Sequence, residues 1–345
     1  MAKKIRIAIN GFGRIGRTTF KAALEHENEV EVVALNDLGS AENMAYLLKY
    51  DTNYGIYGRE IGFGTNFLSV DGKKFSLYAE KDPKRLPWKK LQVDVVLECT
   101  GRFTNKDDAG RHLTAGAKQV IISAPAKSGG PIGTFVLGVN AHAGRAWKKA
   151  KGTEVISNAS CTTNCIAPVM AVLESAFGVK KALMTTVHSY TADQNLVDGP
   201  HTDFRRGRSA GANIVPTSTG AALATTETIP SLKGKFDGIA IRVPSTTGSL
   251  SDITAVVKKK VTVQSVNAAF KKAAKNPLFK GILAVSEEEL VSKDIVGRPE
   301  SAIVDLALTM VVGDDLVKVF AWYDNEWAYS LRLVEEAILV GKAVA

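Results

Sequence analysis

Residues 4–16 read Lys4-Ile5-Arg6-Ile7-Ala8-Ile9-Asn10-Gly11-Phe12-Gly13-Arg14-Ile15-Gly16, and this stretch decides the fold. Its first half alternates and is rich in isoleucine, which is typical of a β-strand. Its second half has the spacing Gly-x-Gly-x-x-Gly, and a helical pattern follows from Arg17 to Glu25. A strand, a glycine-rich turn and a helix in this order predict the first unit of a doubly wound α/β sheet.

The rest of the first half of the chain continues this alternation. Further strands are expected at residues 30–35, 93–98 and 119–123, with a helix at residues 106–115 between the last two. Strands that alternate with helices pair in parallel through right-handed crossovers. Residues 1–157 are therefore predicted to form a doubly wound domain of the Rossmann type.

The pattern changes after about residue 157. Longer strand-like runs appear, and few helices interrupt them; the strands are expected at residues 182–188, 236–243, 251–257 and 316–323, and a helix at residues 263–274. Residues 158–325 are predicted to form an α+β domain with a mixed or antiparallel sheet. The final segment, residues 326–345, is predicted to be helical and to pack back on the first domain.

Length and composition indicate a globular protein of about two domains. The chain has 345 residues, of which 45% are hydrophobic, and three cysteines, too few for a disulfide framework. Its N-terminal stretch lacks the apolar core of a signal peptide, and no apolar run reaches membrane-spanning length. We therefore expect a cytoplasmic protein that does not enter a membrane.

The formal net charge is +9, and the excess of Lys and Arg is spread along the chain. This balance suits anionic small molecules and permits weak, salt-sensitive binding of nucleic acid. No nucleic-acid motif of the usual types stands out, so nucleic acid is not expected as the main partner.

The glycine-rich turn and an acidic residue predict a dinucleotide site. Gly11 permits the tight turn, Gly13 lets a pyrophosphate approach the backbone, and Gly16 allows close packing of helix on strand. Asp37 follows the second strand about twenty residues later, where a carboxylate holds the ribose hydroxyls and repels a 2′-phosphate. The sequence thus favours NAD over NADP as cofactor, and a glycine-rich turn in a flavodoxin-like sheet is the alternative.

A cysteine lies among small polar residues in the stretch Ser157-Asn158-Ala159-Ser160-Cys161-Thr162-Thr163-Asn164-Cys165, immediately before an apolar helical run. Ser, Thr and Asn at such a place are helix N-cap residues. Cys161 is therefore expected at a helix N-terminus, where backbone N–H groups and the helix dipole favour the nucleophilic thiolate. A buried structural cysteine is the alternative, and it is the preferred interpretation for Cys165.

His188 ends a predicted strand and enters a polar loop, where it could act as a general base toward Cys161. The other four histidines lack such a setting, and no His, Cys and Asp spacing among them indicates a metal site. An isolated histidine at a strand end is otherwise more often a capping or solvent-facing residue.

Two further features predict anion binding. Arg242 is a charge inside an apolar strand and needs an anionic partner from the protein or a ligand. Residues 216–222 offer hydroxyl and N–H groups before a helix, and the basic loop at residues 205–208 could add phosphate contacts or form a solvated or subunit-interface cluster.

Together, a nucleophilic cysteine and a bound NAD indicate one reaction, the oxidation of an aldehyde through a thioester.

At this point the chain resembles the phosphorylating, NAD-dependent glyceraldehyde-3-phosphate dehydrogenases of glycolysis. The resemblance runs nearly end to end and rests on eight motifs in order: Ile9–Arg17, Asn36–Leu38, Leu47–Asp51, Glu98–Gly101, Ser157–Cys165, His188–Thr191, Gly238–Pro244 and Trp322–Trp327.

The resemblance implies a role for each motif. It implies Cys161 as nucleophile, His188 as base, and Thr191 and Arg242 as ligands of the substrate phosphate. The position of inorganic phosphate would be lined by Ser160, Thr162, Arg208, Thr219 and Gly220. For NAD it implies Arg14, Ile15, Asp37, Ser123 and Asn325, together with the three glycines. Lys81 stands where family members often carry Arg near the adenine.

The resemblance also implies a homotetramer, in which the loop at about residues 193–214 reaches the cofactor of a neighbouring subunit. Two alternatives remain open at this stage. Erythrose-4-phosphate dehydrogenase is a close relative that hydrolyses the thioester, and Thr191 after His188-Ser189-Tyr190 favours the phosphorylating enzyme. A nucleic-acid or partner-binding role is expected to be secondary at most.

Overall fold

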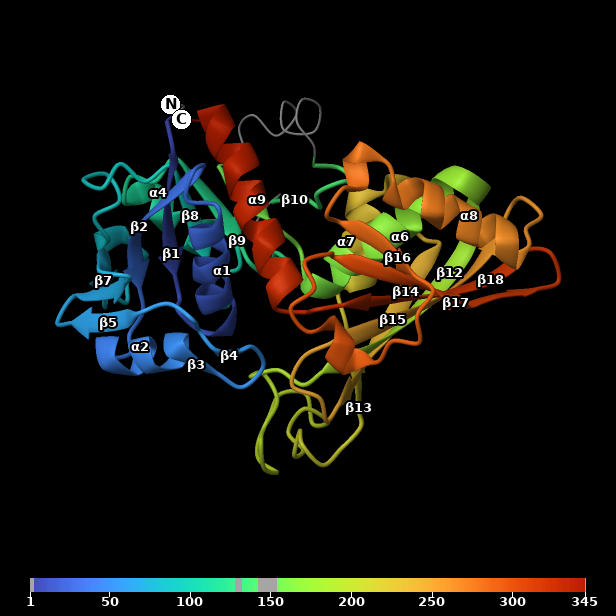
Figure 1. The fold of residues 1–345 in the computed structure, drawn as a ribbon, viewed down its shortest axis with the longest axis horizontal. Helices are drawn as coiled ribbons and strands as arrows, with labels where there is room; N and C mark the ends of the chain where they lie inside the picture. Colours follow the sequence, from blue (N-terminus) through green and yellow to red (C-terminus); the bar gives the residue numbers. More distant parts are fainter. Residues whose placement is uncertain (1–2, 128–131, 142–153, 345) are drawn as a thin grey trace. The chain divides into compact units, whose positions relative to one another are not determined.

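The structure, a computed structural model, describes residues 3–127, 132–141 and 154–344 (Figure 1). The chain divides into two compact units. The first comprises Met1–Phe135, Ala141–Ala159 and Ser330–Ala345, and the second comprises Val136–Asn140 and Ser160–Tyr329.

A nine-stranded sheet forms the centre of the first unit. Its strands lie in the order β10 (Gly133–Thr134), β11 (Val155–Ser157), β9 (Gln119–Ile122), β8 (Val95–Glu98), β1 (Ile5–Asn10), β2 (Val30–Asn36), β7 (Lys73–Tyr78), β6 (Phe67–Val70) and β5 (Ile61–Gly64). All neighbours are parallel except the pairs β5–β6 and β6–β7. Because the chain proceeds outward in both directions from β1, the sheet is doubly wound as predicted.

Helices flank this sheet, and its central strands are buried on both faces, as parallel strands usually are. The helical and remaining short elements are α1 (Arg14–Glu25), α2 (Ala41–Lys49), α3 (Lys106–Ala109), α4 (Arg111–Thr114), η1 (Pro83–Arg85), α9 (Trp327–Val344) and the hairpin of β3 (Tyr50–Asp51) and β4 (Gly55–Ile56). The helix expected at residues 106–115 is present, but it is interrupted at Gly110 and forms two short segments, α3 and α4.

The C-terminal helix α9 lies beside α1 (Figure 1). The hydroxyl groups of Thr18 and Ser330 are 2.6 Å apart, and Lys342 forms an ion pair with Glu29 at 2.8 Å. The last helix of the chain is therefore part of the unit that the first strand begins.

The second unit contains a seven-stranded mixed sheet. Its order is β13 (Val215–Ser218), β14 (Phe236–Val243), β12 (Val179–Ser189), β15 (Ser249–Val257), β18 (Leu316–Tyr323), β17 (Ala302–Val312) and β16 (Leu283–Ser286). The pairs β12–β14 and β16–β17 are parallel, and the others are antiparallel. The predicted α/β class, with a doubly wound first sheet and a mixed second one, is confirmed.

One face of the second sheet packs against helices. These are α6 (Cys161–Phe177), α7 (Ala221–Thr228) and α8 (Val263–Ala274), with short 3₁₀ turns η2 (Pro230–Leu232), η3 (Pro277–Phe279) and η4 (Ser292–Ile295). Helix α6 is apolar nearly all round and lies in the hydrophobic core with Ile166, Val169 and Met170. Its burial holds its N-terminal residue, Cys161, in a fixed place. No helix among the described residues has the length and apolarity needed to cross a membrane.

Candidate active site

The glycine-rich turn has the geometry that a dinucleotide site needs. Gly11 has φ +94°, and a Cβ there would lie 2.7 Å from the backbone nitrogen of Thr100. A Cβ on Gly16 would lie 1.9 Å from the carbonyl oxygen of Gly11, whereas Gly13 has no atom within 4 Å of its Cβ position. The first and third glycines thus allow close packing, and the second leaves the N-terminus of α1 open to a pyrophosphate.

Asp37 lies at the same end of the sheet. Its carboxylate accepts hydrogen bonds from the backbone N–H groups of Phe12 at 2.6 Å and Gly39 at 3.0 Å. This places an acidic group directly beside the glycine-rich turn, at the carboxyl ends of β1 and β2. The arrangement suits a ribose with free hydroxyls and repels a 2′-phosphate.

The other residues expected to contact NAD have varied settings. Arg14 is bound to the buried carboxylate of Asp51 at 2.8 Å, and Ile15 follows it in the first turn of α1. Ser123 follows β9 and donates its backbone N–H to the carbonyl oxygen of Glu98 at 3.0 Å. Lys81 is exposed. Of these side chains, that of Arg14 pairs with Asp51, and that of Ser123 forms a hydrogen bond with the Cys99 thiol.

Cys161 is the first residue of α6, as predicted. Ser160 is its N-cap and accepts a hydrogen bond from the backbone N–H of Thr163 at 3.0 Å. Ala159, the residue before Ser160, has φ +55°, so the chain turns sharply from β11 into the helix. Strained non-glycine residues of this kind are found at functional sites, because the surrounding structure must hold them.

His188 approaches the cysteine from β12. Its Nε2 lies 3.4 Å from Sγ of Cys161, and its Nδ1 lies 2.7 Å from both the carbonyl oxygen of Ser189 and a guanidinium nitrogen of Arg242. Because Nδ1 carries at most one proton, it cannot donate to Ser189 and accept from Arg242 at once. With the proton on Nδ1, Nε2 is the acceptor that a general base toward the thiol requires.

Burial sets the protonation of this pair. It lowers the pKa of His188 to about 3, and the positive charge of Arg242 adds to the shift. Burial also raises the pKa of the Cys161 thiol, although Arg242 and the backbone N–H groups of Thr162 and Cys161 act in the opposite direction. Burial thus opposes the thiolate that the sequence predicts, whereas Arg242 and the N–H groups at the helix N-terminus favour it. A pKa of about 3 for His188 corresponds to a neutral imidazole beside the cysteine.

Replacing Arg242 by leucine is expected to raise the pKa of His188. The guanidinium disfavours a second positive charge at 2.7 Å, so its removal shifts the pKa upward from about 3, while burial keeps it below its ordinary value of about 6.5. NMR titration of ¹³C-labelled histidine rings measures the shift. Arg208→Leu is the control, and an unchanged His188 pKa in Arg242→Leu would contradict the electrostatic role.

Thr162 and its neighbours belong to a buried hydroxyl chain that the sequence did not reveal. The hydroxyl of Tyr323 lies 2.9 Å from that of Thr162 and 2.8 Å from that of Thr186, and the Tyr323 ring packs edge-on against His188. These partners come from β12, α6 and β18, which are far apart along the chain. Tyr323 thereby ties the base and the start of α6 together.

The expected anion-binding groups are only partly brought together. Thr219 and Gly220 precede α7, whose N-terminus has no side-chain cap, and Thr191 is half-buried after β12. Arg208, by contrast, is exposed and forms an ion pair with Asp198 at 2.9 Å. Arg206 is the cation that reaches residues 217 and 218, through the Thr217 hydroxyl at 2.9 Å and the Ser218 carbonyl at 3.2 Å.

Asn325 has an oriented amide. Its Oδ1 accepts hydrogen bonds from the backbone N–H of Gly248 at 3.1 Å and from the hydroxyls of Ser249 at 2.9 Å and Thr247 at 3.4 Å. A backbone N–H can only donate, so the oxygen end of the amide is identified and its NH₂ group faces the other way.

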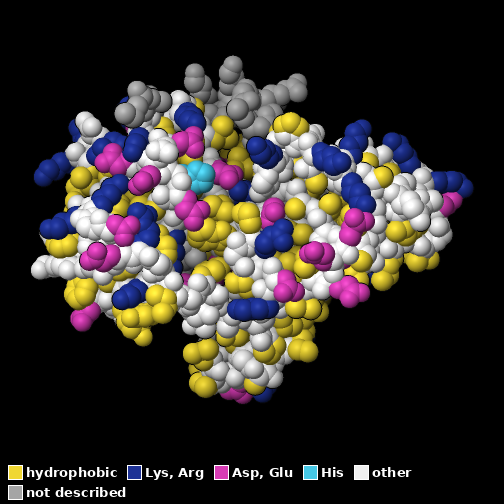
Figure 2. Space-filling model, in the orientation of Figure 1, with side chains coloured by type: hydrophobic (Ala, Val, Ile, Leu, Met, Phe, Trp, Pro, Cys, Tyr) yellow, Lys and Arg dark blue, Asp and Glu magenta, His cyan; other side chains and the backbone are white. Residues whose placement is uncertain are grey.

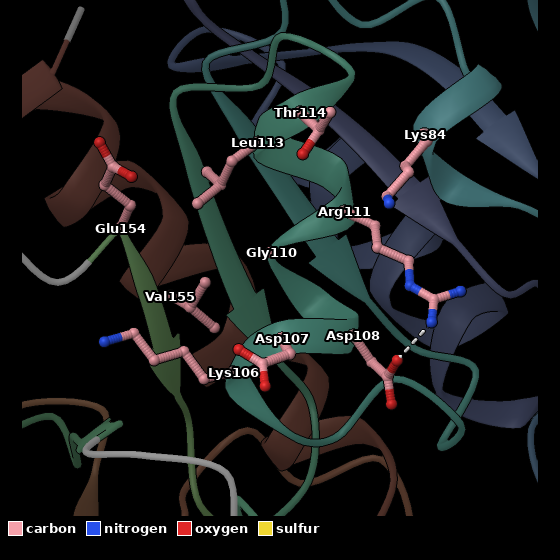
Figure 3. A pocket seen from close by; sticks show the side chains of 10 residues that line it. All are labelled: Lys84, Lys106, Asp107, Asp108, Gly110, Arg111, Leu113, Thr114, Glu154 and Val155. Carbon is pink, nitrogen blue, oxygen red and sulfur yellow. Dashed lines mark hydrogen bonds and ion pairs between the residues drawn. The ribbon is translucent and has the colours of Figure 1, made fainter.

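A pocket beside α3 and α4 in the first unit is a separate feature (Figure 3). It has a volume of about 570 Å³, and its lining of Lys84, Arg111, Asp108 and other residues contains none of the predicted site residues. Arg111 and Asp108 pair with each other there at 2.8 Å. Across the described residues, no group of three or more His, Cys, Asp or Glu side chains could hold a metal ion.

Comparison with known proteins identifies related sequences over both units. The family model described as glyceraldehyde 3-phosphate dehydrogenase, NAD binding domain, matches residues 5–106, and that of the C-terminal domain matches residues 160–325. The chain is 51% identical over 337 residues to glyceraldehyde-3-phosphate dehydrogenase 2 of Streptomyces avermitilis, covering 98% of each protein.

Two further relatives are similar over most of their length. Glyceraldehyde-3-phosphate dehydrogenase of Geobacillus stearothermophilus is 51% identical over 336 residues, covering 97% of this chain and 98% of the relative. The chloroplastic glyceraldehyde-3-phosphate dehydrogenase A of Chlamydomonas reinhardtii is 49% identical over 342 residues, covering 99% of this chain and 90% of the relative.

Proposed function

Because the chain belongs to the glyceraldehyde-3-phosphate dehydrogenase family, we propose that it oxidises D-glyceraldehyde 3-phosphate to 1,3-bisphosphoglycerate with reduction of NAD. The observation that carries the proposal is the 3.4 Å approach of a histidine Nε2 to a cysteine Sγ at a helix N-terminus. That pair has the nucleophile and base that aldehyde oxidation through a thioester requires. The reaction is a step of glycolysis and gluconeogenesis.

Cys161 and His188 are the catalytic residues in this proposal. His188 takes the thiol proton as the sulfur adds to the aldehyde carbonyl and returns it to the carbonyl oxygen, which gives a thiohemiacetal. The neutral His188 then removes the hydroxyl proton as the hydride leaves the carbon; NAD, held by the residues assigned below, would supply the hydride acceptor, and a thioester remains on Cys161. Inorganic phosphate attacks the thioester carbonyl, and the cysteine sulfur leaves and takes the proton back from His188, which releases the acyl phosphate.

The phosphate groups need cations and N–H donors. We assign Thr191 and Arg242 to the substrate phosphate, and the buried Nε of Arg242, which lacks a hydrogen-bond partner among the described residues, supports this assignment. The position of inorganic phosphate is assigned to Ser160, Thr162, Arg208, Thr219 and Gly220. Arg206 is added because its guanidinium, which also pairs with Asp193 and Asp203, contacts the segment that precedes Thr219.

The NAD site is assigned to Gly11, Gly13, Arg14, Ile15, Gly16, Asp37, Lys81, Ser123 and Asn325. The glycine geometry and the position of Asp37 support the first members of this set. For Asn325, the anchored oxygen leaves the NH₂ group to orient the nicotinamide carboxamide. We further propose that residues 1–157 with 326–345 serve as the NAD-binding domain and residues 158–325 as the catalytic domain.

A homotetramer is also part of the proposal. The loop at residues 193–214 carries large hydrophobic side chains that are mostly exposed, with Phe204 86% and Leu196 76% accessible, and Val197 and Ile214 resemble them. Figure 2 shows hydrophobic side chains on the lowest part of the molecule, where Figure 1 places this loop. Such exposure supports burial against another subunit, which sedimentation velocity of the purified protein tests.

The proposed location and secondary partners are supported by the state of the cysteines and by the surface charge. The three cysteines are free, which supports a cytoplasmic protein in a reducing compartment. On the face drawn in Figure 2, Lys and Arg side chains are interspersed with Asp and Glu. This distribution supports small anionic ligands, with nucleic acid or a protein partner in a secondary role only.

NADH formation from glyceraldehyde 3-phosphate is expected to depend on inorganic phosphate or arsenate. The steady-state rate measured by absorbance should fall to a small fraction when both are omitted, because the thioester then persists on Cys161. A rate indifferent to both anions would contradict the proposal and indicate hydrolysis, as in erythrose-4-phosphate dehydrogenase. That enzyme's substrate, erythrose 4-phosphate, is the matched comparison in the same assay.

A further inference from the structure

A buried carboxylate lies beneath the dinucleotide turn. Glu98 ends β8 and is only 1% exposed. Its Oε1 accepts hydrogen bonds from the backbone N–H of Thr100 at 2.8 Å and from the Thr100 hydroxyl. Its Oε2 accepts from the side-chain amide of Asn10 at 2.5 Å and faces Nε2 of His112 at 3.0 Å.

The indole of Trp88 settles which nitrogen of His112 carries the proton. The Trp88 N–H can only donate, and it lies 2.9 Å from Nδ1 of His112. Nδ1 is therefore the acceptor, and Nε2 carries the hydrogen that it donates to Glu98. All four groups around the Glu98 carboxylate are thus donors, so the side chain must be an acceptor at both of its oxygens.

This network joins the strand ends that carry the dinucleotide site. Asn10 ends β1, and its Oδ1 accepts a hydrogen bond at 2.7 Å from the amide of Asn36, which ends β2. Gly11 and Asp37 are the next residues along the chain. Thr100 packs so closely against Gly11 that a Cβ on Gly11 would lie 2.7 Å from the Thr100 nitrogen. The Glu98 carboxylate therefore links Thr100 to Asn10 on the two sides of the turn.

We propose that Glu98 is a positioning residue for NAD, whose carboxylate holds the Gly11 turn and Thr100 in the arrangement that binds the dinucleotide. The proposal rests on the NAD site described under the proposed function. Glu98 is buried, with only 1% of its surface exposed. It acts through Asn10 and Thr100, and His112 and Trp88 hold it from the other side.

The substitution Glu98→Gln tests this proposal, because glutamine has nearly the same shape as glutamate. The glutamine NH₂ group would face either the two Thr100 donors or the donors from Asn10 and His112, so two of the four hydrogen bonds are replaced by opposed donors. We expect the Kd for NAD⁺ to rise by about tenfold. The KM for NAD⁺ should rise with it, while the KM for glyceraldehyde 3-phosphate and the rate of Cys161 alkylation without NAD⁺ stay near wild type.

The chain offers a matched control in Glu336→Gln. Glu336 lies on α9 of the same unit, is also 1% exposed, and neither of its oxygens has a hydrogen-bond partner among the described residues. Burial raises the pKa of Glu336 well above its ordinary value, which favours the neutral form that glutamine resembles. The Kd of the Glu336→Gln variant for NAD⁺ should stay within about twofold of wild type.

The measurements are NAD⁺ titration calorimetry, the Tm without ligand and steady-state kinetics on the full-length protein. A Glu98→Gln variant that loses Tm but keeps the wild-type Kd for NAD⁺ would overturn the proposal, because the carboxylate would then be purely structural. If Glu98→Gln does not fold, His112→Phe removes the donor to Oε2 of Glu98 together with the acceptor of the Trp88 N–H, and a Kd unchanged from wild type in that variant would equally overturn it. Failure of the wild type to bind NAD⁺ would instead overturn the proposed function.

Discussion

Cys161→Ser is expected to abolish NADH formation, with kcat lower by at least about 10⁴-fold. A hydroxyl is far less acidic than a thiol, and Nε2 of His188 at 3.4 Å is too weak a base to generate an alkoxide. Losses on the order of 10⁴ to 10⁶ are typical when a covalent nucleophile is removed. The measurement is the steady-state rate at saturating substrate, phosphate and NAD⁺, with NAD⁺ affinity measured in parallel.

Cys165→Ser is the control for this substitution. Cys165 lies one helical turn further along α6, fully buried, with its sulfur 3.8 Å from the carbonyl oxygen of Ala321, so a serine there can donate to the same oxygen. Burial raises the pKa of its thiol, and it has no base beside it. The assignment of the nucleophile fails if Cys161→Ser keeps more than about a hundredth of the activity or if Cys165→Ser loses as much.

His188→Asn is expected to lower kcat by about 10²- to 10⁴-fold, the usual contribution of a general base. Asparagine keeps a polar side chain of similar reach toward Ser189 and Arg242 but cannot take a proton from the Cys161 thiol. The Kd for NAD⁺ should change little, since neither His188 nor its polar partners Ser189 and Arg242 belong to the assigned NAD site. The measurement is kcat against pH, compared with the Kd for NAD⁺.

The control for the base is His26→Asn, which changes a half-buried histidine at the end of α1. It should leave kcat near wild type. A His188→Asn variant with kcat within about tenfold of wild type would show that another group accepts the proton.

Much of the architecture could be predicted because local patterns agree with the final structure. The strand at residues 236–243, the helix at residues 263–274 and the strand at residues 316–323 have the predicted bounds. Other elements were missed for identifiable reasons. Strand β17 changes register between Asp305 and Met310, which breaks the alternation that marks a strand.

The hairpin of β6 and β7 has a clear local signal in the sequence. Asp71 and Gly72 join two alternating runs, and both residues have positive φ, at 48° and 77°. Asp-Gly between such runs is among the strongest short-range signals of a β-hairpin. Here the information was local and available.

The active-site features also fall into two groups, those that a local motif predicts and those that depend on the tertiary fold. Cys161, with its N-cap, is a local motif and was found from the sequence alone. The protonation of the pair was not, because it depends on the burial of His188 and on Arg242, 54 residues away. His112 was set aside as lacking a functional setting, and its partners Trp88 and Glu98 reach it only through the fold.

The position of α9 has a consequence for the order in which the protein can fold during synthesis. The first unit begins the chain, but its residues from Ser330 onward leave the ribosome only after the whole second unit. Until then Ile5 lacks the close contact of Gly341, where a Cβ would lie 2.2 Å from the isoleucine side chain, and Thr18 lacks Ser330. The second unit can complete its core first, although domains usually fold in the order of synthesis. The dinucleotide-binding unit therefore contains the first residues to be synthesised, but it is the last of the two units to be completed.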